Sequence, residues 1–279
     1  AYNIAKALTE NGNIYGFTQS ADSHLMKNSE WGAVTYLSKS KYGIYNESMA
    51  TTNVSLNSGS RARTETNGKS EMDSVYSVTG CTTGAIGTES VGKVTTIDKI
   101  NSTSGNSASD GVYTWNQLNG VNLSSTGTIY GIYDLNGGLW ERVSDYIANE
   151  NEYLKIYGAS ISYEGNELKT LSNKYAKVYL YDSTTDNSDI EINNNTLSIA
   201  AKNNWNKSQL VYGDAIIETS TGQAGNYGWN NSYTHFLALN GCYMCRGAHW
   251  TAKNGGLFSY NKTNGTSYYS DGFRVTLIV

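Results

Sequence analysis

Four side chains near the C-terminus have the types that bind metals or carry out redox chemistry: His235, Cys242, Cys245 and His249. Thiolates and imidazoles are zinc ligands, and a Cys-x-x-Cys pair can also form a disulfide or a redox couple. The spacing of these residues is not that of a zinc finger, and no second Cys-x-x-Cys accompanies it. Ordinary thiols are the favoured interpretation, with zinc and a disulfide or redox pair as alternatives, and no cofactor is expected.

A second group of potential ligands is acidic and consists of Asp182, Asp186, Asp189 and Glu191. Carboxylates are calcium ligands, but this group lacks the glycine and the regular spacing of a known calcium loop. A solvated acidic loop is therefore favoured over a calcium site. With 3 His and no Gly-x-Ser-x-Gly, the sequence gives no support to a hydrolytic triad.

The stretch from Asn226 to Val279 differs from the rest of the chain. Asp271 is its only acidic residue, whereas it holds several Lys and Arg and many Tyr and Trp. Aromatic and basic side chains are enriched at recognition surfaces, so this stretch predicts a binding face. The alternative is that its aromatic residues belong to core strands.

The composition limits the class of protein. The chain has 279 residues with no Pro, 23 Tyr against 4 Phe, and 29 Gly, so turns must be made by Gly and Asn. The net charge of -4 gives no reason to expect nucleic acid as a partner. No apolar run approaches the ~18 residues of a membrane span, and a sequence beginning at Ala1 is interpreted as a mature or trimmed ectodomain, from which an anchor could have been removed.

Few regular elements are expected, and most lie outside two long polar segments. Residues 4–8 predict a short helix ended by Asn11-Gly12. A second helix is predicted after a cap at Asn28 or Ser29, with Trp31, Val34 and Leu37 on one face. Strands are predicted at 129–133, 177–181, 210–212 and 273–279. The polar segments, about 51–125 and 181–206, are predicted to be insertions in a single domain.

Three motifs in order carry a resemblance to a known family. They are Asn28–Val34 with its Glu-Trp pair, Gly131–Asp145 with the run Asn-Gly-Gly-Leu-Trp-Glu-Arg, and Arg246–Trp250, followed by Gly272–Val275. The set resembles the formylglycine-generating-enzyme-like branch of the C-type lectin fold. It is most similar to the variable proteins that bacterial and phage retroelements diversify, some of which are linked to pilins. The implied fold class is α+β.

The central motif should serve mainly as scaffold. Gly137 and Gly138 suit a tight turn, and Trp140 is expected to fill the core. A buried Glu141 needs a cationic partner, for which Arg274 and Arg246 are the candidates. The oxidase branch of the family uses a cysteine pair after its Arg-Gly turn, but this sequence has no cysteine between 249 and 264. The resemblance therefore favours a protein that is not an enzyme over an oxidase or other metal-dependent enzyme.

In the diversified relatives a fixed scaffold presents exchangeable side chains near the C-terminus. The resemblance implies a variable ligand-binding region at about 230–270, with Tyr243, Trp250 and Tyr260 as anchors. The expected ligand is a surface protein or glycan, and the expected location is extracellular, on a bacterial surface or a phage virion. A structural pilus or virion subunit is an alternative. The candidate binding residues are Tyr243, His249, Trp250, Thr251, Ser259, Tyr260, Asn261, Thr263, Ser267, Tyr268 and Tyr269.

Overall fold

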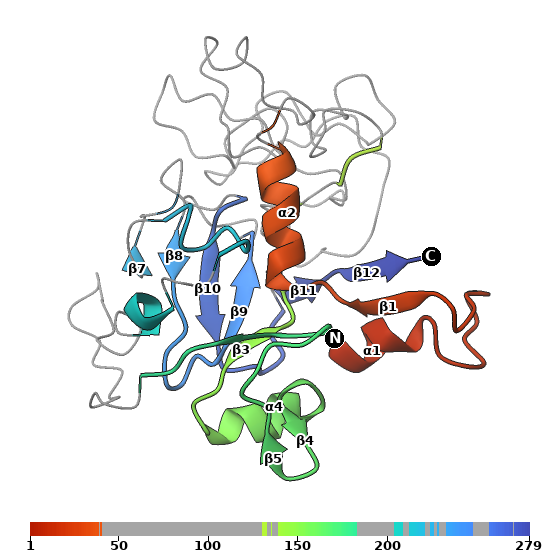
Figure 1. Ribbon diagram of the computed structural model, residues 1–279, viewed down its shortest axis with the longest axis horizontal. Coiled ribbons are helices and arrows are strands. Elements are labelled where there is room, and N and C mark those ends of the chain that lie inside the picture. Colours follow the sequence, from red (N-terminus) through yellow and green to blue (C-terminus); the bar gives the residue numbers. More distant parts are fainter. Residues whose placement is uncertain are drawn as a thin grey trace.

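The computed structural model describes residues 1–38, 40, 130–132, 135, 139–182, 204–208, 212–220, 224–225, 228, 233–247, 257–269 and 271–279. In these parts the chain is mixed α+β, with few helices and several small sheets (Figure 1). The α+β class is therefore confirmed. The predicted insertion at about 51–125, and all but the ends of that at about 181–206, lie outside the described residues.

The largest sheet has six strands in the order β11-β2-β9-β10-β8-β7. β11 runs parallel to β2, whereas β2, β9 and β10 are antiparallel neighbours. β10 is parallel to β8, which pairs antiparallel with β7. The strands are β2 (Trp140–Arg142), β7 (Ala224–Gly225), β8 (Thr234–His235), β9 (Tyr243–Arg246), β10 (Tyr260–Thr263) and β11 (Asp271–Phe273).

The Trp-Glu-Arg run of the central motif forms β2, and its first two residues take the expected roles. Trp140 is buried and packs with Cys245 and Tyr233 in a small cluster of its own. Glu141 is buried and accepts a hydrogen bond from Nε of Arg274 at 2.7 Å. The prediction that Trp140 is buried and that Glu141 has an arginine partner is confirmed, and the partner is Arg274.

Helix α2 (Asn28–Ser38) occurs where the sequence predicts it, and its buried face departs from the predicted one at Leu37. The buried positions are Asn28, Trp31, Gly32 and Thr35, whereas Leu37 is exposed. A Cβ at Gly32 would lie 2.6 Å from the carbonyl carbon of Asp214, so the helix touches the backbone of that segment directly. The predicted face is therefore right for Trp31 and for Val34, which packs partly buried against the core, and wrong for Leu37.

The start of α2 is capped by a mechanism other than the predicted one. Asn28 lies inside the helix, and its amide donates to Oη of Tyr179 at 2.6 Å in the core. Glu30 instead accepts the backbone N–H of Lys27 at 2.8 Å. A hydrogen bond from the backbone N–H of the residue before the helix to the side chain of the third helical residue is one half of a capping box.

Arg246, at the end of β9, lies fully buried between α2 and the sheet. Its Nη1 donates to Oδ1 of Asn28 at 3.0 Å, and its guanidinium lies over the rings of Trp31 and Tyr260. Burial lowers the pKa of Arg246, whereas the nearby carboxyl of Asp214 opposes that shift. The guanidinium therefore joins the helix, the sheet and the 214–215 segment.

The main core surrounds this arginine and is rich in aromatic side chains. Tyr179 packs edge-on against Phe236, and Phe236 against Tyr260. Tyr179 also donates from Oη to Oδ2 of Asp214 at 2.6 Å. The hydroxyls of these buried tyrosines thus have partners, as burial of a polar tip requires.

A separate two-stranded arm contains both ends of the chain. β1 (Asp22–Leu25) pairs antiparallel with β12 (Val275–Ile278), and α1 (Tyr2–Ala7) lies against β1 (Figure 1). The predicted strand at 273–279 is therefore divided: Phe273 ends β11, and Val275 begins β12. Gly12 has φ +81°, consistent with the predicted turn after the first helix.

The remaining elements form a layer beside the sheet. β3 (Asp145–Ile147) runs parallel to β6 (Lys177–Tyr179), so a strand does begin at 177 as predicted. Between them lie α4 (Glu152–Ser162) and the hairpin of β4 (Tyr163–Glu164) and β5 (Glu167–Leu168). Of the strands predicted at 129–133 and 210–212, the described residues 130–132 and 212 lie outside strands.

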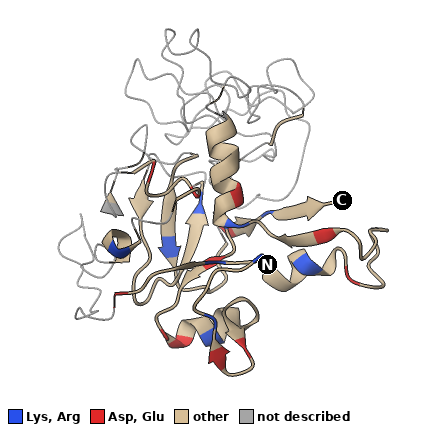
Figure 2. Cartoon of the chain, viewed as in Figure 1, with Lys and Arg blue, Asp and Glu red and all other residues tan. Residues whose placement is uncertain are grey.

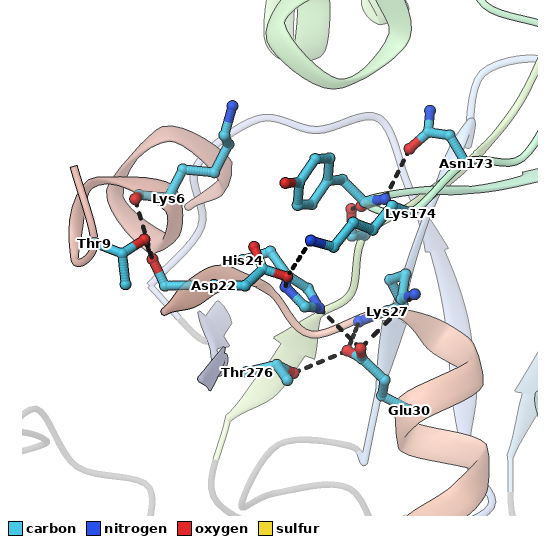
Figure 3. A network of polar contacts seen from close by, with 12 residues as sticks. Lys6, Thr9, Asp22, His24, Lys27, Glu30, Asn173, Lys174 and Thr276 are labelled. Atoms are coloured by element: carbon cyan, nitrogen blue, oxygen red, sulfur yellow. Dashed lines mark hydrogen bonds and ion pairs between the residues drawn. The ribbon is translucent and has the colours of Figure 1, made fainter. Parts of the chain in front are cut away.

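Polar contacts fasten the arm to α2, with His24 at their centre (Figure 3). His24 is buried, and its Nε2 lies 2.8 Å from Oε1 of Glu30 while its Nδ1 lies 3.3 Å from Oδ2 of Asp22. Lys174 reaches the same Asp22 oxygen at 2.9 Å, and Thr276 donates to Glu30 at 2.8 Å. The contacts thus link β1, β12, α2 and the 174 loop.

This arrangement makes the stability of the arm depend on pH. Burial raises the pKa of Glu30, but hydrogen bonds from Lys27, His24 and Thr276 outweigh it, so the pKa lies below its usual value. A depressed carboxyl pKa stabilises the fold above the unfolded-state value of about 4.3, and this contribution is lost as pH falls through the folded-state value.

We therefore expect Glu30→Gln to lower the free energy of unfolding by about 1–2 kcal/mol at pH 7. In urea titrations across pH, the difference from the parent should narrow below pH ~4.5. Glu152→Gln is the matched control, since Glu152 occupies the first turn of an equally long helix but is exposed. A Glu30→Gln deficit that stayed constant down to pH 3 would contradict the assignment.

Candidate ligand-binding cavity

A cavity of about 420 Å³ opens where α1, α4, β2, β9 and β11 come together. In Figure 1 the start of α1 lies between β11 and α4, which places the cavity between the arm and the α4 layer. This volume lies in the range of small-ligand sites. Tyrosines, glycines, serines and one ion pair line it, together with apolar side chains such as Leu25 and Ile161.

The floor is made by Tyr243, the first residue of β9. Its Oη donates to the carbonyl of Leu154 in α4 at 3.2 Å. A Cβ at Gly158 would lie 2.0 Å from that hydroxyl, and one at Gly265 would lie 2.9 Å from the ring. Two glycines therefore let α4 and the 265 turn close onto the Tyr243 side chain, which fixes the floor.

An ion pair between Arg142 and Asp271 forms one wall. β11 and β2 are parallel with Asp271 opposite Trp140 and Phe273 opposite Arg142, so Asp271 lies diagonally across from Arg142 on the same face. Nη2 of Arg142 donates both to Oδ2 of Asp271 and to the carbonyl oxygen of Thr266. Both side chains are mostly buried, and the pair fixes the 266–271 loop against the sheet.

Aromatic side chains surround the opening. Tyr157 of α4 is 45% exposed, Tyr268 is 58% exposed and Phe273 is 38% exposed, and all three line the cavity. The ring of Tyr268 contacts that of Tyr269 at a tilt of 39°, with centroids 4.5 Å apart, and Tyr2 of α1 also contributes to the lining. The opening therefore presents several aromatic rings to solvent around a polar wall.

Three of the predicted binding residues meet at this cavity: Tyr243, Ser267 and Tyr268. Tyr269 is exposed beside Tyr268, as a binding residue must be. Asn261 and Thr263 are half-buried on β10 and do not line the cavity. His249, Trp250 and Thr251 lie outside the described residues.

The expectation that Tyr243 and Tyr260 are exposed anchors is wrong. Tyr243 is 7% exposed and Tyr260 is fully buried, as is Ser259 beside it. Tyr260 pairs across the sheet with Arg246, so its side chain points to the core, where its hydroxyl meets Oγ of Ser220 at 2.9 Å. Burial raises the pKa of Tyr260 to about 12. These two tyrosines are framework, whereas Tyr157, Tyr268 and Tyr269 are exposed.

The two cysteines of the Cys-x-x-Cys run are free and buried. Cys245 lies within β9 and Cys242 immediately precedes it, so they belong to two different apolar clusters. Residues three apart in an extended chain are ~10 Å apart and cannot form a disulfide. Burial raises the pKa of Cys242 to about 12, which keeps it a neutral thiol.

The other sequence-based ligand groups are only partly described. His235 lies on β8 with its Nδ1 3.1 Å from Oη of Tyr233, whereas His249 lies outside the described residues. Of the acidic group, Asp182 alone is described. Within the described residues, no three His, Cys, Asp or Glu side chains are arranged to hold a metal ion.

Most residues of the cavity were not among the candidates, including Tyr2, Arg142, Tyr157 and Asp271. Two of them had a signal in the sequence. Asp271 is the only acidic residue after Asn226, and Arg142 belongs to the central motif. Tyr157 lies on a helix that the sequence also indicates. Asn151 is a capping residue whose side chain accepts the N–H of Tyr153 at 2.9 Å, and Leu154 and Ile161 follow at helical spacing.

Charge gives little direction to binding. Figure 2 shows Lys and Arg interspersed with Asp and Glu over the described elements, and the Arg142–Asp271 pair adds no net charge to the cavity. No helix among the described residues has the length and apolar character needed to cross a bilayer. The mixed distribution of charge therefore does not favour a strongly charged ligand.

Comparison with known proteins adds no family assignment. No family model matches the sequence, and no curated protein or solved structure is significantly similar to it.

Proposed function

We propose that the chain is a non-catalytic ligand-binding protein with a C-type lectin fold, of the formylglycine-generating-enzyme-like kind that retroelements diversify. The motifs at 28–34, 131–145 and 246–250 suggest this family. On this proposal the protein works at a bacterial cell surface or on a phage, as a receptor-binding or adhesion protein. The ligand contacts side chains between about 230 and 270.

The cavity is the observation that carries the proposal. It gathers Ser267 and Tyr268 from the proposed variable region around a floor that Tyr243 fixes. A rigid floor with exposed aromatic residues at its edge lowers the ordering cost of binding, and substitutions at that edge leave the core intact. The buried, neutral thiol of Cys242 also favours binding over thiolate chemistry.

The proposal is tested with the whole chain on an array of immobilised proteins and oligosaccharides. We expect retention of a ligand that is lost with Tyr157→Ala and with Tyr268→Ala, while both variants keep the melting temperature of the parent. Tyr15→Ala is the matched control, because Tyr15 is comparably exposed but does not line the cavity. Retention unaffected by both cavity substitutions, or self-association as the only interaction, would refute the proposal.

Diversification is tested separately at the level of the gene. The coding sequence for about 230–270 should have a nearby near-repeat that differs from it chiefly at adenines. If the coding sequence has no such repeat, diversification is removed from the proposal. Ligand binding is then tested by the array experiment alone.

A further inference from the structure

We infer that the cavity binds an uncharged saccharide, held by stacking on Tyr157 and Tyr268 and by hydrogen bonds to the Arg142–Asp271 wall. This inference rests on the proposed function and deepens it by naming the class of ligand. Its support lies in the uncommitted polar atoms of the wall, the aromatic rings at the opening and the size of the cavity.

The polar wall offers donors and an acceptor side by side. Arg142 makes both of its side-chain contacts through Nη2, so Nη1 and Nε–H remain to donate. Asp271 uses only Oδ2 in the pair, so Oδ1 remains to accept. Neighbouring hydroxyls of a sugar ring both donate and accept, and a planar donor set next to a carboxylate oxygen satisfies two of them together.

The charge of this wall disfavours anionic ligands. Arg142 and Asp271 contact each other directly, so their charges offset. A carboxylate or phosphate that bound Arg142 would also lie near the carboxylate of Asp271, and like charges at short distance repel. An uncharged ligand with hydroxyl groups meets the same wall without that cost.

Two serines enlarge the polar surface. Ser160 of α4 and Ser267 of the loop both line the cavity. Neither hydroxyl has a hydrogen-bond partner within the described part of the chain, so both are available to a ligand or to water. These hydroxyls, with Arg142 and Asp271, place polar atoms on more than one side of the cavity.

The aromatic rings supply the complementary apolar contact. Tyr157 is 45% exposed and Tyr268 58% exposed at the opening. The face of an aromatic ring carries negative charge density, and the C–H bonds on one face of a pyranose are weakly positive. Aromatic faces next to hydroxyl-binding groups therefore match a ligand that is apolar on its faces and polar around its edge.

The size of the site favours a small ligand over a protein surface. A standard protein–protein interface buries about 800 Å² on each partner and is roughly flat. A concave site of about 420 Å³ instead encloses a small molecule or the end of a chain. The terminal sugars of an oligosaccharide fit this description.

The test uses the whole chain on an array of immobilised oligosaccharides, neutral, sialylated, sulfated and uronic-acid-containing, beside immobilised proteins. We expect retention on neutral oligosaccharides and weaker retention on their charged counterparts. Titration of the best oligosaccharide into ¹⁵N-labelled protein should shift the amide signals of Tyr157, Ser267 and Gly272, which line the cavity.

Substitutions of Tyr268 distinguish stacking from other contacts. Tyr268→Ala should weaken binding of the best oligosaccharide about tenfold or more, as loss of an aromatic hot spot does. Tyr268→Phe keeps the ring and should stay within about twofold of the parent. Tyr15→Ala should leave binding unchanged, and melting temperatures of all three report whether the fold is intact.

The outcomes distinguish failure of the saccharide inference from failure of the proposed function. Cavity-dependent binding of proteins alone, or preference for anionic oligosaccharides, would overturn the saccharide inference and leave the proposed function standing. Saccharide binding that Tyr268→Ala and Tyr157→Ala both leave unchanged would overturn the assignment to this cavity. Retention of neither class would overturn the proposed function itself.

Discussion

Replacement of Arg246 by Met is expected to lower the free energy of unfolding by about 3–5 kcal/mol, because it leaves buried groups without their cationic partner. The guanidinium is fully buried and donates to Oδ1 of Asn28 and to the carbonyl oxygens of Asp214 and Ala215. Met fills much of the volume but donates nothing, so three buried acceptors would lose a partner.

The same substitution removes a positive charge that its acidic neighbours need. Burial raises the pKa of Asp214 and raises that of Asp145 well above its usual value, and the charge of Arg246 opposes both shifts. Without Arg246 we expect both carboxyls to hold their protons to higher pH. Above the unfolded-state carboxyl pKa of about 4, the folded variant then binds more protons than its unfolded state, so the deficit should grow as pH rises toward the raised folded-state values.

Urea-induced unfolding followed by tryptophan fluorescence at several pH values measures the effect. Lys174→Met is the control. It also removes a cation that is paired with a carboxylate, that of Asp22, but the Lys174 side chain is exposed. We expect the control to unfold close to the parent, since exposed ion pairs contribute little. If Arg246→Met unfolded at the same urea concentration as Lys174→Met, the central role given to the buried guanidinium would be wrong.

The contrast between Arg246 and Arg274 shows what could be predicted from the sequence. A buried glutamate after a core tryptophan needs a cation, so an arginine partner for Glu141 could be predicted from residue types alone. Which arginine it is depends on strand register. Glu141 lies opposite Arg246 across β2 and β9, yet the ion pair forms with Arg274, just after β11. The register between strands that lie about a hundred residues apart in the sequence cannot be predicted from the local residue pattern.

The tyrosines were harder to assign for a related reason. Tyr260 and Tyr268 have the same type and lie in the same aromatic stretch, but one is fully buried and the other is 58% exposed. Tyr260 begins a strand whose partner residue, Arg246, faces the core, whereas Tyr268 lies in the loop before β11. Strand pairing decides which face Tyr260 takes, because a one-residue shift would reverse it, whereas Tyr268 is exposed by its place in the loop.

The composition of the cavity follows the same principle. Its two charged residues come from strands β2 and β11, its floor from β9, and two of its rings from helices α1 and α4. Sequence motifs could identify β2 and the C-terminal stretch separately. No local pattern could show that α4 closes onto Tyr243, since that contact depends on the absence of a Cβ at Gly158.

Replacement of Gly247 by Ala is the second change for which we expect a large effect, a loss of at least about 3 kcal/mol in the free energy of unfolding. Gly247 follows β9 with φ +85°, a conformation that costs an L-residue roughly 1–2 kcal/mol. A Cβ there would also lie 2.2 Å from the carbonyl oxygen of Leu135 and 3.1 Å from Cη2 of Trp31. Backbone and a fully buried tryptophan cannot move aside cheaply, so a steric cost adds to the conformational one.

Gly12→Ala separates these two costs. Gly12 has nearly the same φ, +81°, but a Cβ there would meet nothing within 4 Å. It should therefore show the conformational cost alone, and the difference between the two variants measures the clash with Leu135 and Trp31. Parallel urea titrations should place Gly247→Ala well below Gly12→Ala in stability. Equal losses would mean that the turn after β9 yields to an added methyl group, and that its close contact with Leu135 and Trp31 does not hold it in place.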